Sequence, residues 1–184
     1  MVKPPLLFLA VNITEAIAII NRMQADGIIG RYAIGGAVGA TFYLEPVTTL
    51  DLDIFVGFRA EPGQLLSLRP IYDYLTSRGY PVEGEYIVVA GWPVQFLPPG
   101  SPLVEEALAE AAERDIDGVP MRVFTAEHLA AIALQLGRAK DKARLLQFVE
   151  AGALDAGRFQ AIVARHGLVE RWRQFERQFL HDQP

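Results

Sequence analysis

Cysteine is absent from the sequence, so neither a disulfide bond nor a thiolate zinc site stabilises this fold, and no cysteine nucleophile carries catalysis. Long apolar runs are missing too. The apolar stretch after Lys3 spans about seven residues, which is too short to cross a bilayer, and no small-residue cleavage site follows it. We therefore expect a protein that works in the cytoplasm and has no membrane partner.

Basic residues are in the minority, with 17 Lys and Arg against 22 Asp and Glu and a formal net charge of −5. This balance argues against broad electrostatic binding to nucleic acid, although a local basic groove can exist inside an acidic protein and leaves RNA open as a substrate. The 184 residues, 51% of them hydrophobic, are enough for a sizeable core. The length indicates one domain, or one domain with a small appendage.

Residues 1–124 have the pattern of a mixed α/β domain, in which short apolar strands alternate with helices. Asn12, followed by Glu15, predicts the cap of a first helix that ends near Asp26. A tight turn at Gly91-Trp92 is expected to join two of the strands. The expected strands are residues 31–34, 50–58, 86–90, 93–97 and 121–124, and further helices are expected after Gly36 and over residues 64–78 and 103–112.

Residues 125–184 are predicted to be wholly helical, starting from Thr125 as an N-cap. Gly137, Gly152 and Gly167 separate the expected helices, which are residues 127–136, 140–150, 156–166 and 168–179. Nothing in the sequence resembles a long linker, so we expect the two parts to pack together with a cleft between them. The predicted fold class is α/β (α+β), a small mixed sheet with flanking helices followed by a C-terminal helical bundle.

Two aspartates stand out in the strand predicted at residues 50–58. Asp51 and Asp53 alternate with apolar residues, so their side chains share one face of the strand with backbones about 6.6 Å apart. Two like charges in a largely apolar strand are costly unless a metal ion or a basic group compensates them. The pair can hold a hard cation. Alternatively, both aspartates lie on the solvent face of an edge strand.

Gly35 and Gly36 interrupt the chain between the expected strand at residues 31–34 and the short helix after it. A helix that starts at such a break exposes backbone N–H groups, which can bind a phosphate, and glycine allows the phosphate to come close. The pair can equally be nothing more than a tight turn between strand and helix.

Taken together, the Gly-Gly break, a short helix and the Asp-apolar-Asp strand resemble the nucleotidyltransferase superfamily that includes DNA polymerase beta. Later segments, such as VQFLP, LVEEAL and GRAKD, are similar to the abortive-infection (AbiEii-like) nucleotidyltransferase toxins. The resemblance covers roughly residues 30 to 150. It implies a small mixed nucleotidyltransferase sheet in the first part of the chain.

The resemblance also implies a chemistry, namely Mg²⁺-dependent transfer of a nucleotide from a nucleoside triphosphate to an RNA or protein acceptor. Asp51 and Asp53 would be the shared ligands of two metal ions about 3.5–4 Å apart, and Gly35 and Gly36 would cradle the phosphates. A third acid on a neighbouring strand usually serves as ligand and base, and that place is taken here by Gln95, which offers neither charge nor a proton-accepting carboxylate. Two further family positions also depart from the pattern, since Ala133 replaces a lysine and Arg144 replaces an acid.

A basic group lies after Gly137, formed by Arg138, Lys140, Lys142 and Arg144. If it faces the cleft, it suits a triphosphate or RNA, and we assign Arg138, Lys140 and Asp141 to nucleotide or phosphate binding. The alternative is a solvated helix face in which Asp141 is an internal ion-pair partner.

Three functions remain in competition. The first is an active nucleotidyltransferase, with an antitoxin protein as a further partner if it belongs to a toxin–antitoxin pair. The second, motivated by Gln95, is a catalytically degenerate protein of the same fold that binds a nucleotide or a partner. The third is an interaction protein that dimerises through an apolar stripe on its last helix, formed by Leu168, Trp172, Phe175 and Phe179. His128, near a helix start, is expected to cap or pack rather than to act in the site.

Overall fold

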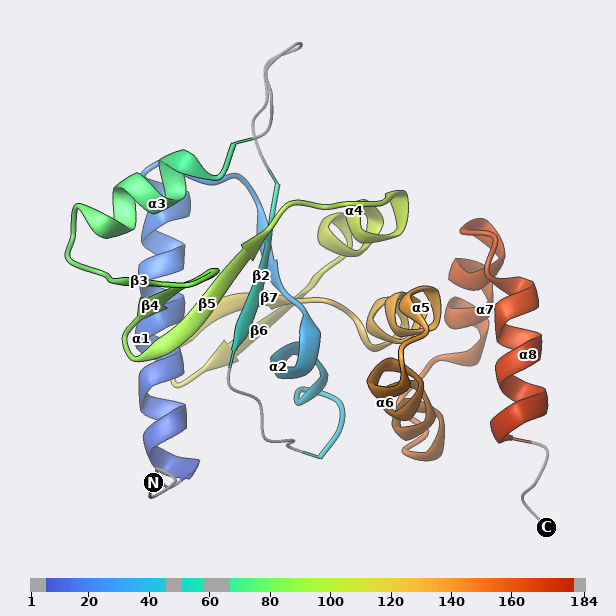
Figure 1. Ribbon diagram of the computed structural model, residues 1–184. Helices are drawn as coiled ribbons and strands as arrows, with labels where there is room; N and C mark the ends of the chain where they lie inside the picture. Colours follow the sequence, from blue (N-terminus) through green and yellow to red (C-terminus); the bar gives the residue numbers. More distant parts are fainter. Residues whose placement is uncertain (1–5, 46–50, 58–66, 181–184) are drawn as a thin grey trace.

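The computed structural model describes residues 6–45, 51–57 and 67–180, with side chains from Ile13 onward. Its centre is a mixed sheet of seven strands in the order β3-β4-β5-β2-β1-β7-β6 (Figure 1). The strands are β1 (Tyr32–Ile34), β2 (Leu52–Val56), β3 (Val82–Glu83), β4 (Tyr86–Val89), β5 (Trp92–Leu97), β6 (Ala112–Ile116) and β7 (Val119–Val123).

Strand β2 lies in the middle of this sheet. It pairs antiparallel with β1, where Ile54 is opposite Ile34, and parallel with β5, where Asp53 is opposite Gln95. Strand β1 in turn pairs parallel with β7. The aspartates therefore do not lie on an edge strand, and the alternative that placed them there is wrong.

One face of the sheet is covered by α1 (Leu6–Ala25) and α3 (Arg69–Thr76), as Figure 1 shows. The apolar residues of β2 point to this side, because Leu52, Ile54 and Val56 are each 0% exposed and belong to the same cluster as Ile17 of α1. Burial of each such side chain stabilises the fold by about 1.5–3 kcal/mol.

The opposite face carries a second apolar cluster, to which the C-terminal helices contribute. It joins Ala33 of β1 and Phe124 with residues of the helices on that side. Thr125 caps the first helix of this region, because its side chain accepts a hydrogen bond from the backbone of His128 at 3.4 Å. The helices on this side are α2 (Gly36–Ala40), α4 (Pro102–Ala109), α5 (Ala126–Leu136), α6 (Ala139–Glu150), α7 (Ala156–Arg165) and α8 (Val169–Phe179).

The predicted fold class is confirmed, and several local predictions need correction. The first helix begins at Leu6, so Asn12 lies inside it and is not its cap. The turn between β4 and β5 is at Ala90-Gly91, because Trp92 already belongs to the strand and is buried against the first cluster. Strands β3 and β6 were not predicted. Residues 46–50 and 58–66, which include parts of a predicted strand and helix, lie outside the described residues.

Among the described helices, none combines the length and the apolar character that a membrane span requires.

Candidate functional site

Of the two aspartates of the predicted site, Asp53 lies in β2 and Asp51 directly precedes the strand, on the side opposite to the buried apolar residues of β2. Burial alternates along the strand, so that Asp51 and Asp53 are half-buried while Leu52 between them is fully buried. Phe55, the next residue on the acidic side, packs against Phe124 with tilted rings whose centroids are 4.8 Å apart. The side chains of Asp51 and Asp53 therefore face the side of the sheet that carries the C-terminal helices, rather than bulk solvent.

The Gly35-Gly36 turn contacts the second aspartate directly. The N–H of Gly35 donates a hydrogen bond to the backbone oxygen of Asp53 at 3.0 Å. A β-carbon on Gly36 would overlap the Oδ2 atom of Asp53, and Gly36 also has a φ of +59°, which disfavours other residues. A β-carbon on Gly35 would lie 2.5 Å from the ring of Phe55. The turn is thus a close-packed strand-to-helix turn, and both glycines leave room for the residues of β2.

Gln95 lies beside Asp53. The two residues are paired in register on parallel strands, so both side chains point to the same face, with backbones about 4.8 Å apart. Tyr86 lies on the next strand, just before Ile87, which pairs with Val94. Burial and the nearby carboxylates of Glu85, Asp51 and Asp53 raise the pKa of the Tyr86 hydroxyl.

Tyr86 was not among the predicted site residues. The sequence places it at the start of an expected strand, but only the pairing of β4 with β5 brings it toward the acids. Exposure alternates along β4, with Ile87 and Val89 buried, but all four of its residues are apolar or aromatic, so nothing in the sequence indicated the orientation of Tyr86.

Cations of helix α6 and its N-cap residue influence the pKa of Asp53. Burial, together with the charge of Asp51, raises the pKa of Asp53, and the positive charges of Arg144, Lys140 and Arg138 oppose that rise. Arg144, Lys140 and Arg138 of the basic group therefore lie within electrostatic range of Asp53. Lys142 is separate, because it lines a different cavity together with Arg171 and Phe175 of α8.

Asp141 has a local role in helix α6. Its carboxylate accepts hydrogen bonds from the Arg138 side chain, at 2.6 Å from Nε and 3.2 Å from Nη2, and from the Arg138 backbone N–H at 3.3 Å. Asp141 is only 2% exposed. This ion pair caps the helix start and orients Arg138. Ala133, where the family resemblance implies a lysine, is buried in the second apolar cluster.

A second polar cluster lies between α4, α5 and α7. Glu106 accepts hydrogen bonds from Arg165 at 2.7 and 2.9 Å and from His166 at 2.9 Å, while Nε2 of the fully buried His128 is 3.3 Å from its Oε1. The ion pair with Arg165, ahead of the contacts with His166 and His128, lowers the pKa of Glu106 to about 2.

Three groups of this cluster have the spacing of a possible metal site, because donor atoms of Glu106, Glu110 and His128 lie within 4.8 Å of one another. Two arginines compete with a cation here, since Arg165 contacts Glu106 and Arg158 contacts Glu110 at 3.0 Å. The carboxylates are thus already neutralised. His128 packs and bridges helices, as expected, and burial lowers its pKa.

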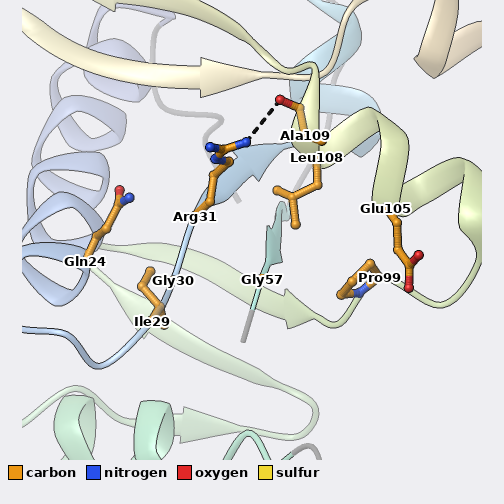
Figure 2. A pocket seen from close by; sticks show the side chains of 9 residues that line it. All are labelled: Gln24, Ile29, Gly30, Arg31, Gly57, Pro99, Glu105, Leu108 and Ala109. Atoms are coloured by element: carbon orange, nitrogen blue, oxygen red, sulfur yellow. Dashed lines mark hydrogen bonds between the residues drawn. The ribbon is translucent and has the colours of Figure 1, made fainter. Parts of the chain in front are cut away.

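Figure 2 shows a cavity of about 530 Å³ at the other end of β2. Gly57 lines it, about 20 Å along the strand from Asp51. Arg31 points across it and donates a hydrogen bond to the backbone oxygen of Ala109 at 3.2 Å. The cavity is therefore separate from the acids and α6.

Several solved structures are similar to this chain. A nucleotidyltransferase-like antigen of Paracoccidioides brasiliensis aligns with a TM-score of 0.56 at 13% identity, covering 83% of this chain and 85% of that one. The antibiotic-resistance factor ANT(2'')-Ia aligns in its solution structure with a TM-score of 0.51 at 16% identity over 94% and 97% of the chains. Its crystal structure in complex with adenylyl-2''-tobramycin gives 0.50 at 15% identity over 89% and 98%.

These likenesses establish a nucleotidyltransferase-like fold. No protein-family profile matches the sequence. A search of curated proteins likewise finds no match.

Proposed function

We propose that this protein is a magnesium-dependent nucleotidyltransferase that moves a nucleotide from a nucleoside triphosphate to an RNA or protein acceptor. One observation carries the proposal: in a nucleotidyltransferase-like fold, Asp51 and Asp53 share a half-buried face that also receives the positive charges of α6. Such a face suits a ligand that combines a divalent cation with a polyanion, which is what a metal-bound triphosphate is.

The donor groups at this site fit Mg²⁺. Asp51 and Asp53 offer carboxylate oxygens from one face of β2, and oxygen is the ligand atom that Mg²⁺ prefers. Burial and the charge of Asp51 raise the pKa of Asp53, and a bound cation would offset the cost of keeping both carboxylates charged. When bound, Mg²⁺ would neutralise charge on the phosphates and lower the pKa of the acceptor hydroxyl.

The other residues of the proposed site bind and orient the phosphates. Gly36 leaves room for the carboxylate of Asp53, so this ligand lies directly beside the Gly35-Gly36 turn that we propose binds the phosphates. Arg138 and Lys140 would bind phosphate oxygens. Asp141 belongs to the site as a positioning residue, because its ion pair fixes the guanidinium of Arg138.

For the acceptor, we propose RNA or protein, in keeping with the resemblance to abortive-infection toxins, and an antitoxin protein as the partner that restrains the activity in the cytoplasm. ANT(2'')-Ia, which has a similar fold, has been crystallised with adenylyl-2''-tobramycin, and an aminoglycoside therefore belongs in the set of acceptors to test.

A catalytically degenerate nucleotide-binding protein is the second candidate, and Gln95 favours it. Its amide stands in register with Asp53, where the family resemblance implies an acid, and an amide cannot take a proton from the acceptor. Both candidate proteins would bind metal and nucleotide at the same site, and only the active enzyme would transfer the nucleotide to an acceptor.

Transfer is tested with nucleoside triphosphates labelled in the α- or the γ-phosphate, incubated with the full chain, Mg²⁺ and total RNA, cell protein or tobramycin. We expect label from the α-phosphate, but not from the γ-phosphate, to appear on one acceptor, and to vanish with Asp53→Ala. Label from the γ-phosphate would indicate phosphoryl transfer instead. Nucleotide binding without any transfer would favour the degenerate protein.

A further inference from the structure

The number of metal ions that the proposed site can hold depends on the groups around Asp53. In a two-metal site the cations are about 3.5–4 Å apart and share carboxylate ligands, and a further acid completes the second ion. On the strand face that carries the acids, the described residues of β2, β4 and β5 provide the carboxylates of Asp51 and Asp53 and the neutral groups of Gln95 and Tyr86.

The pairing of the strands determines which side chains next to Asp53 can donate an oxygen to a metal ion. Gln95 occupies the position in register with Asp53, and its neighbours on the same face of β5 are Pro93 and Leu97, which have no side-chain oxygen. A second divalent ion beside Asp53 would therefore have to use the carboxylates that already hold the first. An amide oxygen adds a ligand but no negative charge.

Helix α6 contributes positive charge to the same place. Lys140 and Arg144 are four residues apart and so lie on one face of the helix, while the charge of Arg138 is partly balanced by Asp141. The family resemblance implies an acid at residue 144, so its replacement reverses the charge there.

We propose that this site holds one divalent cation rather than two, because Gln95 supplies no charge where a second ion would need a carboxylate. The inference rests on the proposed function. Two carboxylates balance the charge of one divalent ion, and the amide of Gln95 adds no charge for a second.

Manganese replaces Mg²⁺ in the test, because its electron paramagnetic resonance spectrum reports both the number of bound ions and whether two ions are close together. The full chain is titrated with Mn²⁺ in the presence of a triphosphate analogue whose α,β-bridge is methylene. We expect one bound Mn²⁺ per bound nucleotide, without spin coupling.

Gln95→Glu restores the missing carboxylate and is expected to recruit a second, spin-coupled Mn²⁺. Gln160→Glu on the exposed surface of α7 adds the same charge elsewhere and should leave the count at one. Two coupled ions in the unaltered protein would overturn the inference and leave the proposed function standing. Failure of the protein to bind Mn²⁺ with the analogue would overturn both. A count of one that Gln95→Glu does not change would contradict the role given to residue 95.

Discussion

The carboxylate of Asp53 lies against Gly36, where its Oδ2 atom occupies the space that a β-carbon on residue 36 would need. The same two segments are joined through the backbone, because the N–H of Gly35 donates to the oxygen of Asp53. Strand β2 and the turn that precedes α2 are thus in direct contact, through the Asp53 side chain and through a backbone hydrogen bond. Any substitution at residue 36 must displace the proposed metal ligand.

Replacing Gly36 with alanine should damage both stability and metal binding. The left-handed φ of +59° costs alanine about 1–2 kcal/mol, and displacement of the Asp53 side chain adds to that cost. We expect the free energy of unfolding, measured in urea, to fall by about 2–4 kcal/mol, and stabilisation by added Mg²⁺ to disappear.

Gly152→Ala is the matched control, because Gly152 has the same φ of +59° and no atom lies within 4 Å of the place that a β-carbon would take there. The free energy of unfolding of this variant should fall only by the cost of the left-handed backbone, about 1–2 kcal/mol, and Mg²⁺ should still affect it as in wild type. Equal losses in the two variants would show that the contact between Gly36 and Asp53 has no energetic importance.

Asp53→Asn should stabilise the metal-free protein at neutral pH. Burial raises the pKa of Asp53 in the folded chain, so the charged carboxylate destabilises the fold at pH values above that raised pKa, and the cost is absent below the unfolded value of 3.8. The midpoint of urea unfolding in chelator should therefore rise in the variant at pH 7, and the gain should disappear near pH 3.

Added Mg²⁺ should reverse this order, since it binds the folded wild-type chain and not the variant. Asp73→Asn serves as a control on the exposed surface of α3, where its ion pair with Arg69 is worth no more than about 1 kcal/mol. An Asp53→Asn variant that is less stable than wild type in chelator would contradict the pKa argument.

Most of the architecture could be predicted from local patterns. The strongly periodic helices of the C-terminal region and the alternation in β2 gave elements close to those observed, since these segments owe their form to local spacing and glycine breaks. Strand β6 is different: its residues Ala112–Ile116 are largely polar, and its place in the sheet comes from pairing with β7 rather than from an apolar face. Polar edge strands of this kind leave little periodic signal.

The candidate site could be predicted only in part. Asp51, Asp53 and the two glycines are close in sequence, so a local pattern was enough to predict them as site residues. The approach of Arg144 and Tyr86 to Asp53 depends on how α6 and β4 pack, over sequence separations that no local pattern encodes. The position of Asp141 in a buried cap with Arg138 was open for the same reason, because both a solvated face and a phosphate site fit the spacing.

The Glu106 cluster predicts a loss of stability in acid. Because the ion pair with Arg165 lowers the pKa of Glu106 from 4.5 to about 2, its contribution to stability is complete above about pH 4.5 and is lost as the pH falls through about 2. Arg165 is half-exposed, and solvent screening reduces the contribution, so we expect Glu106→Gln to cost on the order of 2 kcal/mol at pH 7.

The difference between wild type and Glu106→Gln should shrink toward zero near pH 2, as measured by urea unfolding across the pH range. Glu105→Gln, at an exposed neighbouring position, should change stability by less than about 0.5 kcal/mol at any pH. A deficit of Glu106→Gln that persisted at pH 2 would assign the effect to packing rather than charge.

The apolar stripe of α8 belongs to the core of the chain itself. Trp172 is 8% exposed and meets Phe159 edge-on at 4.9 Å, and Phe175 is also buried. Trp172→Ala should therefore cost about 3–5 kcal/mol in the free energy of unfolding. Arg173→Ala, beside it on the exposed surface, should cost less than about 1 kcal/mol. If Trp172→Ala instead left stability intact and abolished a dimer in sedimentation, the stripe would be an interface.

The central claim is that Asp51 and Asp53 hold a metal ion that binds a nucleoside triphosphate, and calorimetric titration tests it most directly. The full chain and the Asp51→Ala/Asp53→Ala double variant are titrated with each of the four ribonucleoside triphosphates, in Mg²⁺ and again in chelator. The account predicts binding of at least one triphosphate that requires Mg²⁺ and is lost in the double variant. Binding that is equal in Mg²⁺ and chelator, or that survives the loss of both aspartates, would contradict it.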